Sequence, residues 1–345
     1  MKQHMAGWCG LRRTTMSGIA CVVGMGLLCA SLSQLSLAQE HYPAKVVRLV
    51  VPFPPGGGTD ILGRIMASRM SVALGQQVLV ENRAGAAATL GAVAVAKATP
   101  DGYTLLMAAV TVHATYLALL AQNATQAPPF DLDKSFAPIA MVASIPSVIA
   151  VNPSVKANTL SELVALARSR PGALTLASSG NGALTHLAGE VFQRMAGVKL
   201  LHVPYKGAGP AMGDLIGGQV DMIITDVAVT SAHIRSGKLR GLALLAPQRM
   251  ATLADVPTAA EAGMKGFEIS ANLGILAPAG TPAAVIARLS EVLRGMMAAP
   301  DVREQMLAQG VFALYATPEE TAQAIRSEQA RWNRLVRESG IKADS

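Results

Sequence analysis

Cysteine is nearly absent from this 345-residue chain, and its three copies, Cys9, Cys21 and Cys29, all lie near the start. They fall within a segment that we expect to be removed on export. Neither Cys21 nor Cys29 has the small-residue lead-in of a lipid-attachment site. The rest of the chain therefore offers no thiol for a disulfide, a zinc–thiolate site or a cysteine nucleophile.

Charge is also scarce. Charged residues make up 15% of the chain, and the formal net charge of +7 falls to +4 without the three basic residues of the first 38. A mildly positive balance helps attract anions. Lysine and arginine are not clustered with aromatic residues in the pattern typical of nucleic-acid binding. We therefore expect no nucleic acid as a partner.

No membrane-spanning helix is expected after the first 38 residues. The uncharged stretch 102–130 contains threonines, a histidine and two prolines, so a buried strand, a loop and a short helix are the better interpretation. Residues 1–38 have the basic start, apolar stretch and small-residue site of a secretory signal peptide. We expect cleavage after Ala38, and Arg12 and Arg13 leave twin-arginine export open as an alternative route.

The remaining chain, about 300 residues long, is expected to form two domains of roughly 150 residues each. Short β-branched segments alternate with alanine-rich helical segments, a pattern that predicts α/β layers with parallel strands. Strands are expected at 46–51, 78–80, 103–107, 139–143, 148–151, 174–177, 200–203, 220–225 and 242–245.

Two crossings divide these elements between two lobes. Pro146 separates two adjacent predicted strands, and we interpret 144–147 as the first crossing. The segment 267–270 is expected to return the chain to the first lobe. The first lobe would then contain residues 39–143 with 273–345, and the second lobe would contain residues 144–272.

Three glycine-rich loops follow predicted strands and lead into helices, at 52–58, 178–182 and 204–210. The first N–H groups of a helix are unpaired and carry partial positive charge, so such starts favour a carboxylate or a phosphate. Glycine lets the backbone approach the anion closely. None of the loops matches a phosphate P-loop or a dinucleotide fingerprint. Tight turns without a ligand are the alternative.

Several motifs in order along the chain resemble the signatures of the Bug family, the substrate-binding proteins of tripartite tricarboxylate transporters. The likeness extends over nearly all of residues 40–345. The motifs are Phe53–Asp60, Glu81–Gly85, Asp101–Leu105, Thr185–Glu190, His202–Gly207 and Asp255–Thr258.

This resemblance implies a periplasmic, two-lobed α/β binding protein of the type II Venus flytrap kind. Each lobe would have a central sheet flanked by helices, with two crossover segments between the lobes. The implied ligands are di- and tricarboxylates, aromatic acids or acidic amino acids, with no cofactor and no metal. The implied partners are membrane transporter subunits or, alternatively, a membrane sensor. The protein itself is expected to be a monomer.

The resemblance also indicates which residues hold the ligand carboxylate, in the first strand-to-helix loop and in loops of the second lobe. Carried over to this chain, these are Phe53, Gly57, Gly58, Thr59, Asp60, Ser178, Ser179, Asn181, Gly182, Thr225 and Asp226. Two further candidates, Thr111 and Asn272, lie where the chain departs from the family pattern. Asn272 and Leu273 replace a frequent aromatic pair, so we expect a less aromatic pocket.

Three side chains keep two interpretations each. His186 could donate to a ligand oxygen or satisfy a loop carbonyl. Asp226 could receive a ligand amine or cap the helix that follows it. Lys206 could hold ligand charge or stay solvated.

Catalysis is the remaining alternative, as a hydrolase or lyase using Ser178 or Ser179 with His186 and an aspartate. No G-x-S-x-G elbow surrounds either serine, and no metal-ligand spacing is found after the first 38 residues. We therefore expect a binding protein and not an enzyme.

Overall fold

The computed structural model describes residues 42–86, 88–122 and 127–339. The chain divides into a unit that ends at Ala44 and a larger unit that begins at Lys45, and the described helices and strands all belong to the larger unit. The expected signal peptide and its cleavage site lie outside the described residues. Within the described ranges, no helix is both long and apolar enough to cross a bilayer.

The first elements of the chain alternate strand and helix as expected. In order they are β1 (Val47–Val51), α2 (Gly58–Leu74), β2 (Val78–Asn82), α3 (Thr89–Ala96), β3 (Thr104–Ala109), α4 (Val110–Leu120), β4 (Phe136–Val151), α5 (Leu160–Ser169), β5 (Thr175–Ser178) and α6 (Leu184–Ala196). The stretch that resembles a membrane span by composition thus forms β3 and α4, and every residue of β3 is buried.

The second part of the chain continues this alternation until its last three helices. In order the elements are β6 (Leu201–Pro204), α7 (Ala208–Ile216), β7 (Met222–Asp226), α8 (Val227–Arg235), β8 (Arg240–Leu244), a 3₁₀ turn (Ala251–Leu253), β9 (Ser270–Pro278), α9 (Ala283–Ala298), α10 (Pro300–Ala308), β10 (Phe312–Ala316) and α11 (Pro318–Ser339).

The strands form one mixed sheet in the order β2-β1-β3-β9-β4-β7-β5-β6, with β8 and β10 also paired to β4. The prediction of parallel strands is confirmed at the two outer groups, where β1 pairs with β2 and β3, and β5 pairs with β6 and β7. It is wrong at the centre. There β4 runs antiparallel to β7, β8, β9 and β10.

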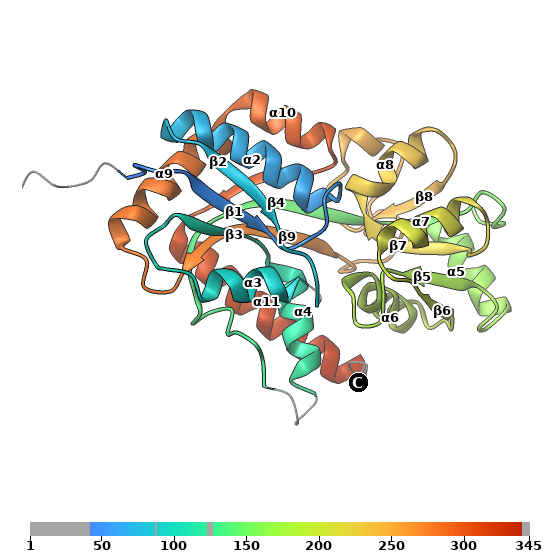
Figure 1. Cartoon of the computed structure of the whole chain (residues 1–345). Coiled ribbons are helices and arrows are strands. Elements are labelled where there is room, and N and C mark those ends of the chain that lie inside the picture. Colours follow the sequence, from blue (N-terminus) through green and yellow to red (C-terminus); the bar gives the residue numbers. More distant parts are fainter. Residues whose placement is uncertain (1–41, 87, 123–126, 340–345) are drawn as a thin grey trace, which may run out of the picture. The chain divides into compact units, whose positions relative to one another are not determined.

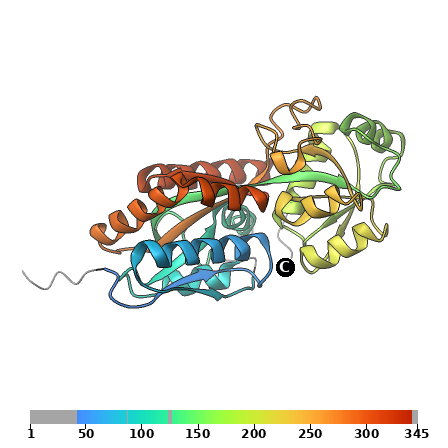
Figure 2. The same cartoon turned by 90° about the horizontal axis from the view of Figure 1, so that it is seen from above.

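The expected break at Pro146 is also wrong, because β4 is one continuous strand of 16 residues. Pro146 has no N–H to donate, and it lies where the strand changes partners. It is the last β4 residue paired with β9, opposite Ser270, and Ser147 is the first paired with β7, opposite Asp226. Figure 2 shows the green strand β4 passing from one half of the sheet into the other.

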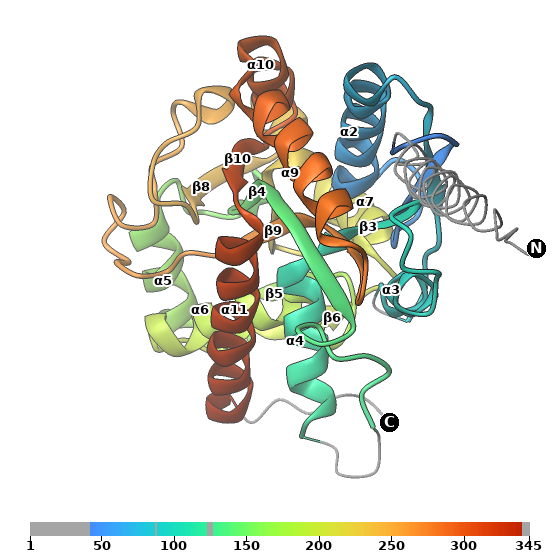
Figure 3. The ribbon, with the colours of Figure 1, turned by 90° about the vertical axis from the view of Figure 1, so that its left-hand side faces the viewer.

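Helices cover both faces of the sheet. In the half that contains β1, β2, β3 and β9, helices α2, α9 and α10 lie on one face and α3, α4 and α11 on the other (Figures 1 and 3). In the half that contains β5, β6 and β7, α7 and α8 lie opposite α5 and α6 (Figure 1). Since both faces are covered, the central strands are buried and apolar, as in α/β folds.

Local capping signals position two of the helices. The Thr159 hydroxyl accepts the N–H of Glu162 at 3.1 Å, and the Glu162 carboxylate accepts the N–H of Asn158 at 2.6 Å. At the start of α11 the exchange is fully reciprocal, because the Thr317 hydroxyl accepts the N–H of Glu320 and the Glu320 carboxylate accepts the N–H of Thr317. Both are capping boxes, in which side chains pair the orphan N–H groups of a helix start.

Candidate functional site

Four helix starts converge where β4 changes partners. β1 and β3 are parallel neighbours, with Val50 opposite Leu106, and they lead into α2 and α4. β5 and β7 are parallel neighbours in the other half, and they lead into α6 and α8. The carboxyl ends of these strands therefore meet at the point where Pro146 precedes Ser147. We call the region formed by the starts of α2, α4, α6 and α8, together with Asn272 of β9, the junction site.

Close contacts join the two halves of the sheet at the junction site. A Cβ on Gly58, at the start of α2, would lie 3.4 Å from Cβ of Ala228 in α8. A Cβ on Gly182, before α6, would lie 2.8 Å from Leu119 in the last turn of α4, so this contact lies away from the start of α4. Gly182 has a φ of +72°, so its backbone conformation favours glycine.

None of these four helices has a side-chain cap. Their N-cap residues are Gly57, Ala109, Ala183 and Asp226, and none of these side chains accepts a hydrogen bond from the helix that follows. The first N–H groups of a helix have no intrahelical acceptor. The junction site therefore brings together four helix starts without side-chain caps, an arrangement suited to an anion.

Asp60 holds the first loop in place. One carboxylate oxygen accepts the Gly56 N–H at 2.9 Å and Arg64 at 3.0 Å, and the other accepts Asn82 at 2.8 Å. Asn82 also donates to the Phe53 carbonyl at 3.1 Å. Burial raises the pKa of Asp60, but the hydrogen bonds from Arg64, Gly56 and Asn82 outweigh it, and the pKa lies below its ordinary value.

These contacts add Asn82 and Arg64 to the residues that build the first loop. Asn82 was visible in the sequence as part of a motif, but its role was not. Ligand binding by Phe53, Gly57, Gly58, Thr59 and Asp60 stays a prediction, and Asp60 already uses both oxygens on the protein.

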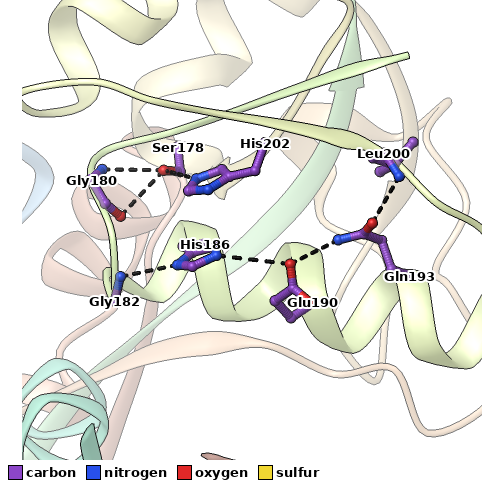
Figure 4. A network of polar contacts seen from close by, with 8 residues as sticks. All are labelled: Ser178, Gly180, Gly182, His186, Glu190, Gln193, Leu200 and His202. Carbon is purple, nitrogen blue, oxygen red and sulfur yellow. Dashed lines mark hydrogen bonds and ion pairs between the residues drawn. The ribbon is translucent and has the colours of Figure 1, made fainter. Parts of the chain in front are cut away.

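The second loop is held by two histidines (Figure 4). The hydroxyl of Ser178 lies 2.6 Å from Nε2 of His202 and 3.2 Å from both the N–H and the carbonyl of Gly180. The ring of His186 stacks on that of His202, with centroids 3.9 Å apart and planes within 2°. His202 was missed by the sequence reasoning, because it pairs with a serine of the neighbouring strand.

His186 accepts a hydrogen bond from the loop instead of satisfying a loop carbonyl. The N–H of Gly182 donates to Nδ1 of His186 at 3.0 Å. Nδ1 must therefore be unprotonated, so Nε2 carries the proton of the neutral ring. Nε2 lies 3.8 Å from the Glu190 carboxylate. His186 thus positions the loop, and a contact of His186 with a ligand stays a prediction.

The remaining candidates of the second half lie at different depths. Ser178 and Thr225 are buried in β5 and β7, whereas Asn181 and Lys206 are exposed in loops. Ser179 is tied to Thr185, whose hydroxyl lies 2.8 Å from the Ser179 N–H and 2.9 Å from its hydroxyl.

Thr111 is fully enclosed at the start of α4. Its hydroxyl donates to Glu328 of α11 at 3.0 Å and accepts the N–H of Asn272 at 3.1 Å. Glu328 also accepts a hydrogen bond from Trp332 at 3.1 Å. Thr111 therefore connects α4, β9 and α11, and its hydroxyl is already paired on the protein.

Asp226 does not cap α8, so the capping interpretation is wrong. It occupies the N-cap position, but its side chain accepts no hydrogen bond from the helix. The residue is only partly exposed. Burial raises the pKa of Asp226 to about 7.

The geometry also bears on the serine-hydrolase alternative. Ser178 pairs with His202 and not with His186, and it has no exposed surface from which to attack a substrate. Across the described ranges of the chain, no three His, Cys, Asp or Glu side chains are placed to hold a metal ion.

Comparison with known proteins gives one consistent family. Residues 62–341 match the model of the tripartite tricarboxylate transporter family receptor. The chain is 37% identical to Protein BugT of Bordetella pertussis (strain Tohama I) over 328 residues, which cover 95% of this chain and 99% of BugT.

Solved structures agree with this match. Periplasmic binding protein BugD is 36% identical with a TM-score of 0.77, covering 88% of this chain and all of BugD. Rpa4515 of R. palustris, solved with adipate, is 31% identical with a TM-score of 0.79, covering 87% and 99%. MatC of Rhodopseudomonas palustris, solved with malate, is 32% identical with a TM-score of 0.74, covering 86% and 100%.

Proposed function

This chain belongs to the tripartite tricarboxylate transporter receptor family, and we propose from that premise that it captures a small carboxylate at the junction site and delivers it to a transporter. Proteins of this family are periplasmic solute-binding proteins with a two-lobed α/β fold. The chain is accordingly a binding protein and not an enzyme.

The observation that supports a carboxylate ligand is the meeting of four uncapped helix starts at the junction site. Backbone N–H groups there can donate to carboxylate oxygens without any arginine or lysine. Gly57, Gly58 and Thr59 would supply them from one half of the sheet. Ser179, Asn181 and Gly182 would face the same ligand from the other half, once His186 releases the N–H of Gly182.

The ligand class we propose is a di- or tricarboxylate, with aromatic acids and acidic amino acids as further candidates. Two structural neighbours were solved with adipate and with malate, and both are dicarboxylates. Asn272 and Leu273 lie at the centre of the junction in β9, opposite Ser144 and Ala143 of β4.

The two halves of the sheet are proposed to move as lobes, 39–143 with 273–345 and 144–272. β4 and β9 join the two halves, and the pairing of β4 changes at Pro146 and Ser147. We expect the lobes to open and close about 144–147 and 270–273. X-ray scattering should show a smaller radius of gyration with saturating ligand. An unchanged radius would contradict closure.

The proposed partner is the membrane part of a tripartite transporter, and a membrane sensor is the second candidate. The protein is expected to act as a monomer. Capture of detergent-solubilised membrane proteins by the liganded chain, followed by mass spectrometry, separates the two: transporter subunits support the first and a sensor kinase or receptor the second.

A thermal-shift screen tests carboxylate binding. A ligand that binds only the folded state raises the melting temperature. We expect a rise with at least one dicarboxylate, tricarboxylate, aromatic acid or acidic amino acid. The matched variant is Asn181→Leu, which should remain folded but lose the shift. Absence of a shift with every acid would contradict the proposed function.

A further inference from the structure

A chain of polar contacts runs along α6 and ends at the second loop (Figure 4). The Leu200 N–H donates to the side-chain oxygen of Gln193 at 2.8 Å, and the Gln193 amide donates to Glu190 at 2.9 Å. The Glu190 carboxylate lies 3.8 Å from Nε2 of His186, whose Nδ1 accepts the Gly182 N–H at 3.0 Å. One imidazole therefore stands between a carboxylate and an N–H that we propose to offer to the ligand.

This imidazole changes its role when it takes a proton. In the neutral ring, Nδ1 is an acceptor and keeps the Gly182 N–H occupied. In the imidazolium both ring nitrogens are donors, so Nδ1–H no longer accepts this N–H and is able to donate to an anion. One proton on His186 thus replaces an occupied N–H by two donors for a carboxylate.

Opposing groups act on the charge of His186. The residue lies in the first turn of α6, whose positive end disfavours a second positive charge, and only 12% of its side chain is exposed. Glu190 favours the charge, because a carboxylate within about 4–6 Å stabilises an imidazolium. A ligand carboxylate at the start of α6 adds an anion on the Nδ1 side. In the complex, the imidazolium of His186 would therefore lie between two carboxylates.

His202 of β6 limits the pair of histidines to one proton. Its ring stacks on that of His186 with centroids 3.9 Å apart, and two positive rings at that distance repel each other. Nε2 of His202 lies 2.6 Å from the neutral hydroxyl of Ser178, whereas the Glu190 carboxylate lies beside His186. Glu190 therefore directs the proton of the pair to His186.

Other ionisable groups on the elements packed against α6 are few. β5 contains none, and β7 contains only Asp226 at its end. Glu338 of α11 pairs at 3.3 Å with Arg194, about two turns of α6 beyond His186. Asp226, whose pKa burial raises to about 7, is the group that a test must separate from His186. The others are Arg334 and Arg337 of α11, His113 and Tyr116 of α4, and Lys206 in the loop after β6.

We propose that His186 is a proton-linked switch for carboxylate capture: it is neutral and holds the Gly182 N–H in the free protein, and it is protonated in the complex, where Nδ1–H and this N–H both donate to the ligand. This inference rests on the proposed function. The proton comes from solvent and binds Nδ1, and no bond of the ligand forms or breaks. Glu190 and His202 are positioning residues, because they act on the ligand through the imidazole. Capture therefore takes up as much as one proton and strengthens as the pH falls towards the ordinary range of imidazole, near pH 6.5.

Isothermal titration calorimetry tests the proton uptake. The acid that binds most tightly among malate, adipate, succinate, citrate and benzoate is titrated at about pH 7, 8 and 9, where carboxyl groups are ionised, in buffers with different ionisation enthalpies. We expect uptake of as much as one proton per ligand. The association constant should fall by about three- to tenfold from pH 7 to pH 8.

Two substitutions in α6 separate the proton from the packing. His186→Asn places an amide near the position of Nδ1, where it accepts from Gly182 through its oxygen or donates to a ligand through its nitrogen, but takes no proton. It should bind with little pH dependence and lose most of the proton uptake. Glu190→Gln keeps an acceptor for Gln193 but removes the charge, so affinity should fall at least about threefold at pH 8 and recover towards pH 6.

The matched control for both substitutions is His233→Asn, in the last turn of α8, which should retain the wild-type affinity and proton uptake. Circular dichroism checks that each variant is folded. If His186→Asn retains the full proton uptake of the wild type, the proton binds elsewhere, for example on Asp226, and this inference is wrong.

NMR assigns the proton to an atom in the wild-type protein. At about pH 7.5, Nδ1 of His186 should have the nitrogen chemical shift of an unprotonated acceptor without ligand and that of a protonated nitrogen in the complex. An unprotonated Nδ1 in the complex, or binding with pH-independent affinity, would overturn this inference and leave the proposed function standing. No binding of malate, adipate, succinate, citrate or benzoate at any pH would overturn both.

Discussion

The backbone N–H of Gly182 donates to Nδ1 of His186 at 3.0 Å, so a donor expected to face a ligand is already used inside the loop. The bond fixes the neutral form of His186 and the conformation of the turn before α6. It also sets a condition on binding, because a ligand can use this N–H only if the imidazole turns away.

Replacing His186 with phenylalanine keeps the stack on His202 but removes the acceptor. We expect the free energy of unfolding to fall by about 1 kcal/mol, because the Gly182 N–H loses its partner. Urea denaturation measures the change. His233→Phe, at the far end of α8, is the control and should be close to neutral. Unchanged stability in His186→Phe would show that the bond does not order the loop.

Gly58 lies where the two halves of the sheet meet, and a side chain there should block binding. A single Cβ would lie 3.4 Å from Ala228 and 3.6 Å from Ile145, so Gly58→Ala fits whereas the extra methyl groups of Gly58→Val do not. We expect Gly58→Val to weaken carboxylate binding at least tenfold by calorimetry.

The matched control for Gly58→Val is Gly209→Val, because Gly209 of α7 has open space around its Cβ position. Gly209→Val should bind like the wild type. Wild-type affinity in Gly58→Val would mean that the first loop does not contact the ligand.

Asp60 should stabilise the fold through the first loop. Asp60→Ala leaves the Gly56 N–H, Arg64 and Asn82 without their acceptor, so we expect a loss of roughly 2–3 kcal/mol in the free energy of unfolding at neutral pH. The pKa of Asp60 is lowered in the folded state, so its contribution is present at neutral pH and is lost in acid. The gap between Asp60→Ala and wild type should therefore narrow below about pH 4. A constant gap across pH would contradict this role.

In the absence of ligand, ionisation of Asp226 should lower the stability of the fold, whereas ionisation of Asp60 raises it. The pKa of Asp226, about 7, exceeds the ordinary value of 3.8, so between these two pH values the folded chain binds more protons than the unfolded chain. Stability contributed by this group is therefore lost as the pH rises. Asp226→Asn should melt above the wild type at about pH 8, by at least about 2 °C. At about pH 4 the two should melt together, and a higher wild-type melting temperature at pH 8 would contradict a raised pKa of Asp226 in the folded chain.

The sequence predicts local features of the fold well. The predicted strand 46–51 is observed as Val47–Val51, and the capping boxes at Thr159 and Thr317 are present. These signals depend on neighbours within a few residues. Pro146 was misleading because proline usually ends a strand, whereas here it lies where β4 exchanges β9 for β7 and β8.

The candidate site was harder to predict, because its contacts join distant segments. Ser178 and His202 are 24 residues apart and meet only because β5 and β6 are neighbours. Asp226 has the residue type and position of a cap, yet its side chain accepts no hydrogen bond from α8. Motifs could therefore indicate the loops that form the junction site, but not the hydrogen bonds that each side chain makes.

A crystal structure of the protein with the acid that gives the largest thermal shift tests the central claim most directly. The account predicts a ligand carboxylate at the junction site, with oxygens about 2.7–3.1 Å from backbone N–H groups at the starts of α2 and α6 or α8. A ligand bound elsewhere, for example in the groove lined by Leu160, Met195 and Met264, would contradict it.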